Sequence, residues 1–350
     1  MTPPMFFNPY IFGGGTVGGW TELGRTTLGS ASDTITVSSL ADKRYYMVLA
    51  DLQPTGNVDE YFRLGNGSAD TGSNYARRFS GDGGADGTGT SQAFVKIGIN
   101  GSASLPRFHA SYIANLSGNE KLAITHGVGP NAAGAGTAPS RRESVWKWVN
   151  TSNPLDVIQM GDDGGAGQYN TGSELVVLEW DPADTHTNNF WQELASVDLS
   201  GGAADSIGSG TFTSKKYLWV QCFTNATGGN NDHKFTVNSD TGTNYAKRTS
   251  TSGGADGTNT SQANLDLTGT HNVSNFTNMF IINNASNEKL FVIHDVTVNT
   301  AGAGTAPVRT ETVGKWDNTS DQIDEVTFTN AVARTGQYGT SSILKVWGAD

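Results

Sequence analysis

The chain has 350 residues, a formal net charge of −11 at neutral pH, 45 glycines and a single cysteine. The acidic balance opposes general binding to nucleic acid, which needs a surplus of lysine and arginine, and one cysteine excludes an intramolecular disulfide framework. Cys222 lies in an apolar run, where we expect a small buried side chain. Only 16% of the residues are charged and no long helical spacing of apolar residues occurs, so many short strands joined by turns are expected.

The chain contains a tandem duplication. Residues 74–93 return at residues 244–263 with identity at 15 of 20 positions. The matching continues at a slightly smaller offset in three further places: residues 119–122 recur at 287–290, the heptapeptide AGAGTAP of residues 133–139 recurs at 301–307, and Trp148 recurs as Trp316. The second copy is two residues shorter, which a surface loop can absorb. A fixed repeat of this length predicts two domains of the same fold.

The repeat defines the expected domain organisation. We predict an N-terminal arm over residues 1–19, a first β-sandwich over 20–181, a linker over 182–190 and a second β-sandwich over 191–350. Each copy is long enough to bury its own core. The predicted fold is all-β, with seven or eight strands per copy, and the length of each copy favours a jelly-roll-like sandwich over an immunoglobulin-like one.

The comparison of the copies predicts which side chains face the core. Val95 and Ile97 stay apolar as Leu265 and Leu267, while the residues between and before them vary freely, which indicates one buried and one wet face. The same reasoning predicts core positions at three more sets of residues: Phe108 and Tyr112 with Phe276 and Phe280, Leu122 and Ile124 with Leu290 and Val292, and Ile158 and Met160 with Val326 and Phe328.

The N-terminal arm has no counterpart before the second copy. Its large apolar side chains would be costly to leave in water, so we expect the arm to dock on its own domain or on a neighbouring molecule. The arm is too short to cross a bilayer and lacks the pattern of a secretory signal, so no membrane partner is predicted. The expected docking residues are Phe6, Phe7, Tyr10, Ile11 and Phe12.

Candidate catalytic and metal sites are few. The sequence has no GxSxG, no HExxH and no paired cysteines. His126 and His294 correspond between the copies, and a hydrogen-bonded role at a strand end is expected for both. Asp82 and Asp86 flank a glycine-rich loop and suggest calcium ligands, but Asp82 is Ser252 in the second copy, which favours a turn. We expect no catalytic residue, no cofactor and no metal. The shared charges are expected to form ion pairs: Arg78 and Arg248, Glu120 and Glu288, Arg141 and Arg309, Glu143 and Glu311.

These features together resemble the structural proteins of tailed-bacteriophage virions. The likeness rests on the short arm bearing Phe and Gly residues, the near absence of cysteine, the Thr-, Ser-, Asn- and Gly-rich strands and the whole-domain duplication. It is closest to jelly-roll decoration, fibre and tail-accessory proteins, and it includes no diagnostic motif. The resemblance implies a non-enzymatic virion protein on the exterior of a capsid or tail, which associates with itself and with other virion proteins through its arm.

An alternative is a carbohydrate-binding or host-receptor-binding β-sandwich. In that case Trp148 and Trp316 would form a stacking platform for a host surface glycan, although tryptophans at strand ends lie more often in the core. Two similar domains in one chain also suit a closed homo-oligomer. Our first choice is a trimer whose six domains form a ring.

Overall fold

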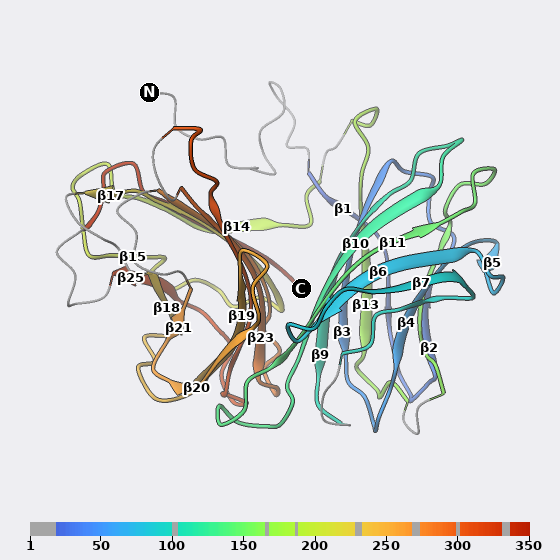
Figure 1. The fold of residues 1–350 in the computed structure, drawn as a ribbon, viewed down its shortest axis with the longest axis horizontal. Helices are drawn as coiled ribbons and strands as arrows, with labels where there is room; N and C mark the ends of the chain where they lie inside the picture. Colours follow the sequence, from blue (N-terminus) through green and yellow to red (C-terminus); the bar gives the residue numbers. More distant parts are fainter. Residues whose placement is uncertain are drawn as a thin grey trace. The chain divides into compact units, whose positions relative to one another are not determined.

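The computed structural model describes residues 19–99, 104–164, 168–185, 188–227, 233–267, 274–298, 302–330 and 337–350. Throughout these residues the regular structure consists of β-strands, and none of them lies in a helix (Figure 1). This confirms the all-β fold class. The frequent glycine, serine and asparagine residues explain the shortness of many strands, because these residues favour turns over continued pairing.

The strands of the first repeat run from β1 to β13. They are β1 (Thr21–Thr27), β2 (Thr34–Val37), β3 (Tyr45–Leu52), β4 (Glu60–Asn66), β5 (Ser68–Ala69), β6 (Tyr75–Gly81), β7 (Gly87–Gln92), β8 (Val95–Lys96), β9 (Arg107–Ala114), β10 (Lys121–Gly129), β11 (Ser140–Trp148), β12 (Val157–Asp162) and β13 (Glu174–Trp180).

The second repeat holds β14 to β27. They are β14 (Gln192–Asp198), β15 (Ser206–Gly208), β16 (Tyr217–Thr224), β17 (Ala226–Thr227), β18 (His233–Val237), β19 (Tyr245–Thr251), β20 (Gly257–Gln262), β21 (Leu265–Asp266), β22 (Asn275–Ile282), β23 (Lys289–Thr297), β24 (Val308–Trp316), β25 (Val326–Asn330), β26 (Gln337–Tyr338) and β27 (Ile343–Ala349).

Each repeat folds into a β-sandwich of antiparallel sheets. In the first repeat an eight-stranded sheet of order β1-β13-β3-β9-β10-β11-β6-β7 is combined with a smaller sheet of order β2-β12-β4-β5, in which β8 also pairs with β4. In the second repeat the orders are β14-β27-β16-β22-β23-β24-β19-β20 and β15-β25-β18-β21, with β17 paired to β26. The large sheets correspond strand for strand, so the duplication in sequence is a duplication of a jelly-roll-like sandwich.

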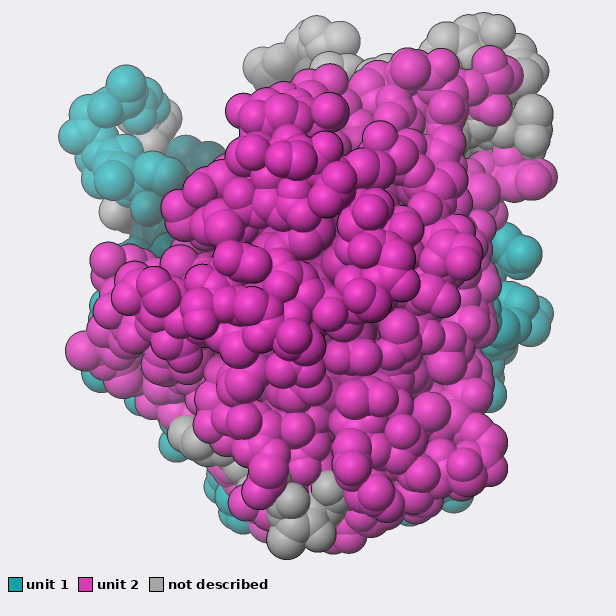
Figure 2. Space-filling view, turned by 90° about the vertical axis from the view of Figure 1, so that its right-hand side faces the viewer, with its two compact units in different colours: residues 1–7, 133–139, 191–350 teal, residues 8–132, 140–190 magenta. Residues whose placement is uncertain are grey.

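The chain divides into two compact units, coloured in Figure 2. The first-repeat unit (magenta) holds the described residues of 8–132 and 140–190. The second-repeat unit (teal) holds Trp191–Asp350 and also Ala133–Pro139, a short segment that the sequence places in the first repeat. This segment is the part of the fold that positions the candidate site.

The small sheet of each unit follows the predicted core positions. Val95, Ile97, Ile158 and Met160 belong to the core of the first-repeat unit, and their counterparts belong to the core of the second. These strands have one apolar and one polar face, so alternation with a period of two identifies the buried side chains correctly.

The large sheet contradicts two of the predicted core assignments. Leu122 and Ile124 are 57% and 48% exposed, and Ala123 between them faces the core instead. Phe108 is buried as predicted, but Ile113 is the residue of β9 that belongs to the core cluster of the unit, and Tyr112 does not belong to it. In the second repeat the predicted Phe280, Leu290 and Val292 are buried, whereas the core cluster contains their neighbours Met279 and Ile281 on β22, and Phe291 and Ile293 on β23. The large sheet carries apolar residues on both faces, so alternation alone does not identify the core side.

Candidate docking site

The candidate site is formed by Ala133–Pro139, which connects β10 to β11 and which we call the docked segment. Gly134 has a φ of 81°, in the left-handed region that glycine adopts without strain. Ala135 and Ala138 are buried. Small side chains let this backbone approach other groups closely, so recognition of the segment depends mainly on its own N–H and C=O groups.

Two carboxylates of the second-repeat unit accept hydrogen bonds from the docked segment. The Gly134 N–H donates to Oε1 of Glu288. The next N–H, of Ala135, donates to Oδ2 of Asp317 at 3.1 Å. Bonds from backbone N–H groups to ionised carboxylates are stronger than neutral ones, so these two bonds fix the position of the turn.

Two further bonds hold the carbonyl groups of the docked segment. The Ser261 N–H donates to the Ala135 oxygen at 2.8 Å, and Nε of Arg248 donates to the Pro139 oxygen at 2.9 Å. We call Arg248, Ser261, Glu288 and Asp317 together the docking surface. It offers acceptors to the N–H groups of the segment and donors to its C=O groups, which is a complementary arrangement.

Burial strengthens the electrostatics of the docking surface. Glu288 is 6% exposed, and its Oε2 lies 3.4 Å from Nζ of the buried Lys315. Burial raises the pKa of the Glu288 carboxyl, while the bond from Gly134 and the charge of Lys315 act in the opposite direction. Burial also lowers the pKa of Lys315. A buried carboxylate is stable only when it is paired and hydrogen-bonded, so the docked segment helps to satisfy Glu288.

Trp148 and Trp316 do not form the predicted glycan platform. Both rings are buried in the cores of their units. Each indole N–H donates to a carboxylate at 2.7 Å, Trp148 to Asp70 and Trp316 to Asp240. A buried ring cannot present its face to a sugar, so these two residues stabilise the fold. The predicted docking arm, with Phe6, Phe7, Tyr10, Ile11 and Phe12, lies outside the described residues.

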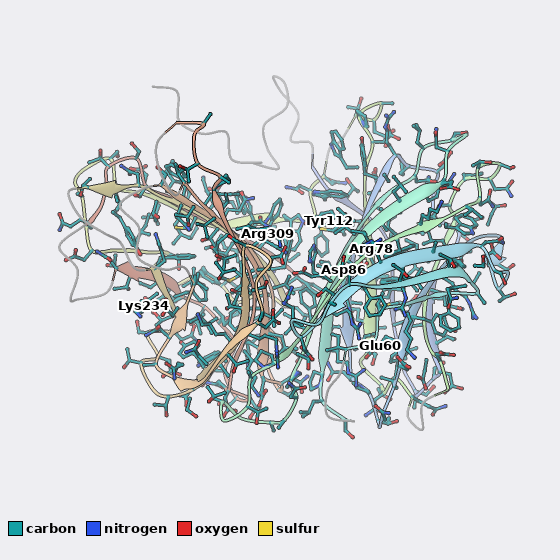
Figure 3. The ribbon with its side chains drawn as sticks, viewed as in Figure 1. Glu60, Arg78, Asp86, Tyr112, Lys234 and Arg309 are labelled. Carbon is teal, nitrogen blue, oxygen red and sulfur yellow. The ribbon has the colours of Figure 1, made fainter. Side chains whose placement is uncertain are left out.

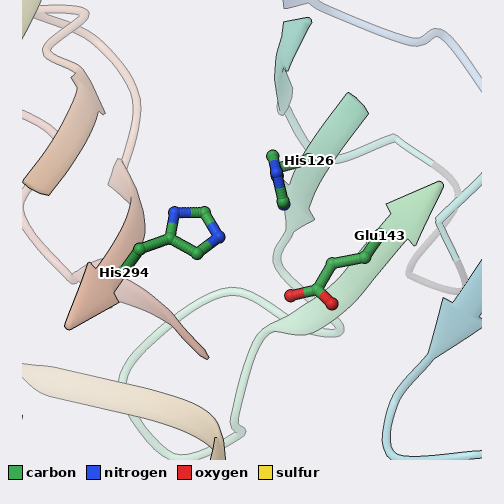
Figure 4. A group of neighbouring side chains, drawn as sticks. All are labelled: His126, Glu143 and His294. Atoms are coloured by element: carbon green, nitrogen blue, oxygen red, sulfur yellow. The ribbon is translucent and has the colours of Figure 1, made fainter. Parts of the chain in front are cut away.

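The shared histidines each lie opposite a shared glutamate. His126 on β10 pairs in register with Glu143 on β11 (Figure 4), and His294 pairs in the same way with Glu311 in its own unit. Glu143 also forms an ion pair with Arg141 at 2.6 Å. Each glutamate is distant in sequence from its histidine, so the sequence did not predict the pair. The antiparallel pairing of the two strands brings the two side chains opposite each other.

The glycine-rich loop behaves as a turn. Asp82 has a φ of 51°, and its carboxylate accepts bonds from the Arg141 N–H at 2.8 Å and from the Ser140 hydroxyl at 3.2 Å. Asp86 forms an ion pair with Arg78 at 3.5 Å (Figure 3). Both carboxylates therefore serve contacts within the fold, and the expected ion pair of Arg78 is confirmed.

Sequence reasoning used the heptapeptide only as evidence of duplication and missed its role. A signal was present, because seven identical residues in two loops exceed what loops usually retain. Asp317 left no such signal, since the first repeat has Val149 at the corresponding position.

Comparisons with known proteins add little to this geometry. No protein-family model matches the chain, and no curated protein matches it. Among solved structures, the chain is similar to the mouse laminin alpha1 chain, domains LG4-5, with 9% identity and a TM-score of 0.19 over 93% of this chain and 90% of that chain. A likeness this small carries no functional argument. The described residues contain no helix long and apolar enough to span a membrane.

Proposed function

We propose that the chain is a non-enzymatic structural protein that assembles with copies of itself. The observation that carries this proposal is the docked segment. A heptapeptide kept in both repeats is held by Glu288, Asp317, Ser261 and Arg248, three of which are also identical in the first repeat. A loop and a matching surface that are both duplicated are suited to linking one β-sandwich to the next.

We further propose that the assembly is the exterior of a bacteriophage capsid or tail. The support is the resemblance of the composition and of the duplicated sandwich to decoration, cement, fibre and tail-accessory proteins. The partners would be other capsid or tail proteins, with the N-terminal arm as a second point of attachment. The net charge of −11 is compatible with an exterior position away from nucleic acid.

Quantitative mass spectrometry of purified particles tests this function. Isotope-labelled peptides from both repeats would give the copy number per particle. The control is a soluble host protein that is about as abundant as this chain in the lysate, because its level in the purified particles measures contamination. We expect tens of copies for a tail or vertex position and hundreds for a capsid coat. A level no higher than that of the host protein would contradict the virion assignment.

Carbohydrate binding is the second candidate, now on different residues. Tyr45 and Trp180 stack with ring centroids 5.5 Å apart, and both are partly exposed. A partly exposed aromatic pair is a platform that a sugar ring can use. A glycan array with the wild type and Trp180→Ala would test this. Binding that disappears in the folded variant would favour this candidate, whereas no binding by the wild type would remove it.

A further inference from the structure

The second repeat carries its own version of the docked segment at residues 302–307. Its sequence, Gly-Ala-Gly-Thr-Ala-Pro, is identical to residues 134–139. It leads into β24 as the docked segment leads into β11, through the same succession of turns. Gly302 has a φ of 88°, close to the 81° of Gly134. The segment therefore holds the backbone shape of the docked form in advance, which lowers the entropic cost of binding.

The two segments differ in their surroundings. Residues 302–307 are all exposed, whereas Ala135 and Ala138 of the docked segment are buried. A Cβ added at Gly134 would lie 3.3 Å from Oδ2 of Asp317, but one added at Gly302 would meet nothing within 4 Å. One peptide thus occurs in the same chain in a docked and an exposed form.

The first repeat carries most of a second docking surface. Arg78, Ser91 and Glu120 occupy the positions of Arg248, Ser261 and Glu288. Ser91 on β7 and Ser261 on β20 share a φ of 51°, so both backbones adopt the same left-handed conformation at this position. Glu120 lies 2.8 Å from Lys147, as Glu288 lies near Lys315 in the second repeat. We call Arg78, Ser91 and Glu120 the first-repeat surface.

The first-repeat surface is accessible. The side chain of Arg78 is 59% exposed, compared with 16% for Arg248. The side chain of Glu120 is 39% exposed, compared with 6% for Glu288. Both the exposed segment and the exposed surface are therefore present in every chain.

We propose that residues 302–307 of one chain dock on the first-repeat surface of a second copy of this chain. The Gly302 N–H would donate to Glu120, the Ser91 N–H to the Ala303 oxygen, and Arg78 to the Pro307 oxygen. This inference rests on the proposed self-assembly and names its site. The contact joins different surfaces of the two chains, so it generates a ring if the rotation closes and a filament if it does not.

Two features favour a second copy as the occupant. The segment is identical in sequence to residues 134–139, which the docking surface binds. The chemical groups that bind this peptide are therefore known, and the first-repeat surface carries most of them. The segment is also uncharged, which avoids repulsion between two chains of net charge −11. The fourth bond is missing, because Val149 replaces Asp317 and gives no acceptor to the Ala303 N–H. Binding between chains should therefore be weaker than docking within the second-repeat unit.

Two full-length variants separate the two sides of the contact. Arg78→Ala combined with Glu120→Gln removes the first-repeat surface, and Ala303→Asp blocks the segment, since its counterpart Ala135 is buried when docked. Sedimentation velocity from nanomolar concentrations to about 100 µM should show assembly of the wild type. Each variant alone should raise the dissociation constant about tenfold or more. An equimolar mixture should form dimers and nothing larger, because each variant keeps one intact partner.

The matched control is Glu22→Gln with Arg25→Ala, an ion pair on β1 of the same unit that lies outside the first-repeat surface. It should assemble as the wild type does. A wild type that stays monomeric throughout overturns the inference together with self-assembly of the free protein. Assembly that is equal in all variants overturns the docking site alone and leaves self-assembly standing. Because Ala303 lies on an exposed segment, Ala303→Asp should remain folded, and circular dichroism would verify this.

Discussion

The two repeats carry side chains of different size and polarity at the same buried positions of their sandwiches. In the first repeat, His109 on β9 lies opposite Gly127 on β10, and the side chain of Arg107 on β9 lies beside Gly129 on β10. The guanidinium of Arg107 forms a buried ion pair with Glu60. Two long side chains from one strand therefore occupy the space left by two glycines of the next.

The second repeat reverses this distribution of volume. Asn275 and Thr277 on β22 are shorter, and they lie opposite Thr297 and Asp295 on β23. The Thr277 hydroxyl donates to the Asp295 carboxylate, and Asn275 donates to the Thr297 hydroxyl at 2.9 Å. The comparison teaches that these positions change as cross-strand pairs, because the total volume and the hydrogen bonding of a buried site must both be preserved.

The difference should give the two units opposite responses to pH, and Asp295 should show the largest effect. Burial raises the pKa of Asp295 to about 7, while Thr277 and Lys247 act in the opposite direction. The folded state thus binds a proton that the unfolded state releases near pH 4. This stabilisation is complete below about pH 4 and is lost as the pH rises through about 7.

Asp295→Asn removes this titration. Above about pH 7 the variant should be more stable than the wild type by as much as about 4 kcal/mol, and the difference should vanish towards about pH 4. Urea unfolding at a series of pH values measures it. Equal unfolding midpoints at about pH 8 would show that the carboxylate is not buried as described.

His109 should give the opposite slope in the first-repeat unit. Burial, together with the charges of Arg107 and Arg142, lowers its pKa to about 3. The unfolded state therefore binds a proton below about pH 6.5 that the folded state refuses, so stability is present above that pH and falls as the pH drops towards 3. At about pH 4 the wild type should have lost about 3 kcal/mol of its free energy of unfolding through this histidine, and His109→Gln should not show this loss. An unchanged acid transition would contradict a buried neutral histidine.

A third variant, with a smaller expected effect, tests whether the large side chain on β9 requires a glycine opposite it on β10. A Cβ at Gly127 would lie 2.5 Å from Nδ1 of His109, so Gly127→Ala forces a displacement in the core. We expect a loss of about 2 kcal/mol in the free energy of unfolding. His109→Thr, which copies the second repeat, should relieve most of the overlap when combined with it. Gly136→Ala is the matched control, because its Cβ would meet nothing within 4 Å. If the losses in the free energy of unfolding of the two single variants simply add in the double variant, residues 109 and 127 do not change as a pair.

Much of the fold could be predicted from the sequence, for physical reasons. The identity of residues 74–93 and 244–263 indicated duplicated domains, and the turn-rich composition indicated short strands. Val95 and Ile97 were placed correctly because their strand has one wet face. Leu122 was placed wrongly because apolar residues occupy both faces of the large sheet, and a period of two cannot then distinguish them.

The candidate site was less accessible to prediction. The docked segment could be seen as a repeated heptapeptide, but its partners are distant in sequence, and one of them, Asp317, differs between the copies. The repeats therefore could not reveal it by comparison. Trp148 and Trp316 were correctly identified as shared by the two repeats. The structure explains this by their packing in each core, where each indole N–H donates a hydrogen bond to a carboxylate, and not by a surface function.

The smallest expected effect would make the two docking surfaces alike. Val149 is exposed at the position that Asp317 occupies in the second repeat, where Oδ2 accepts the Ala135 N–H at 3.1 Å. Val149→Asp should supply the missing acceptor for the Ala303 N–H of a second chain. One added bond to a charged group should tighten self-association about tenfold, which sedimentation velocity would detect. Val149→Thr has a similar shape without a carboxylate and should leave the dissociation constant unchanged. If Val149→Asp weakens association instead, the added charge meets no donor, and the two surfaces are not used in the same way.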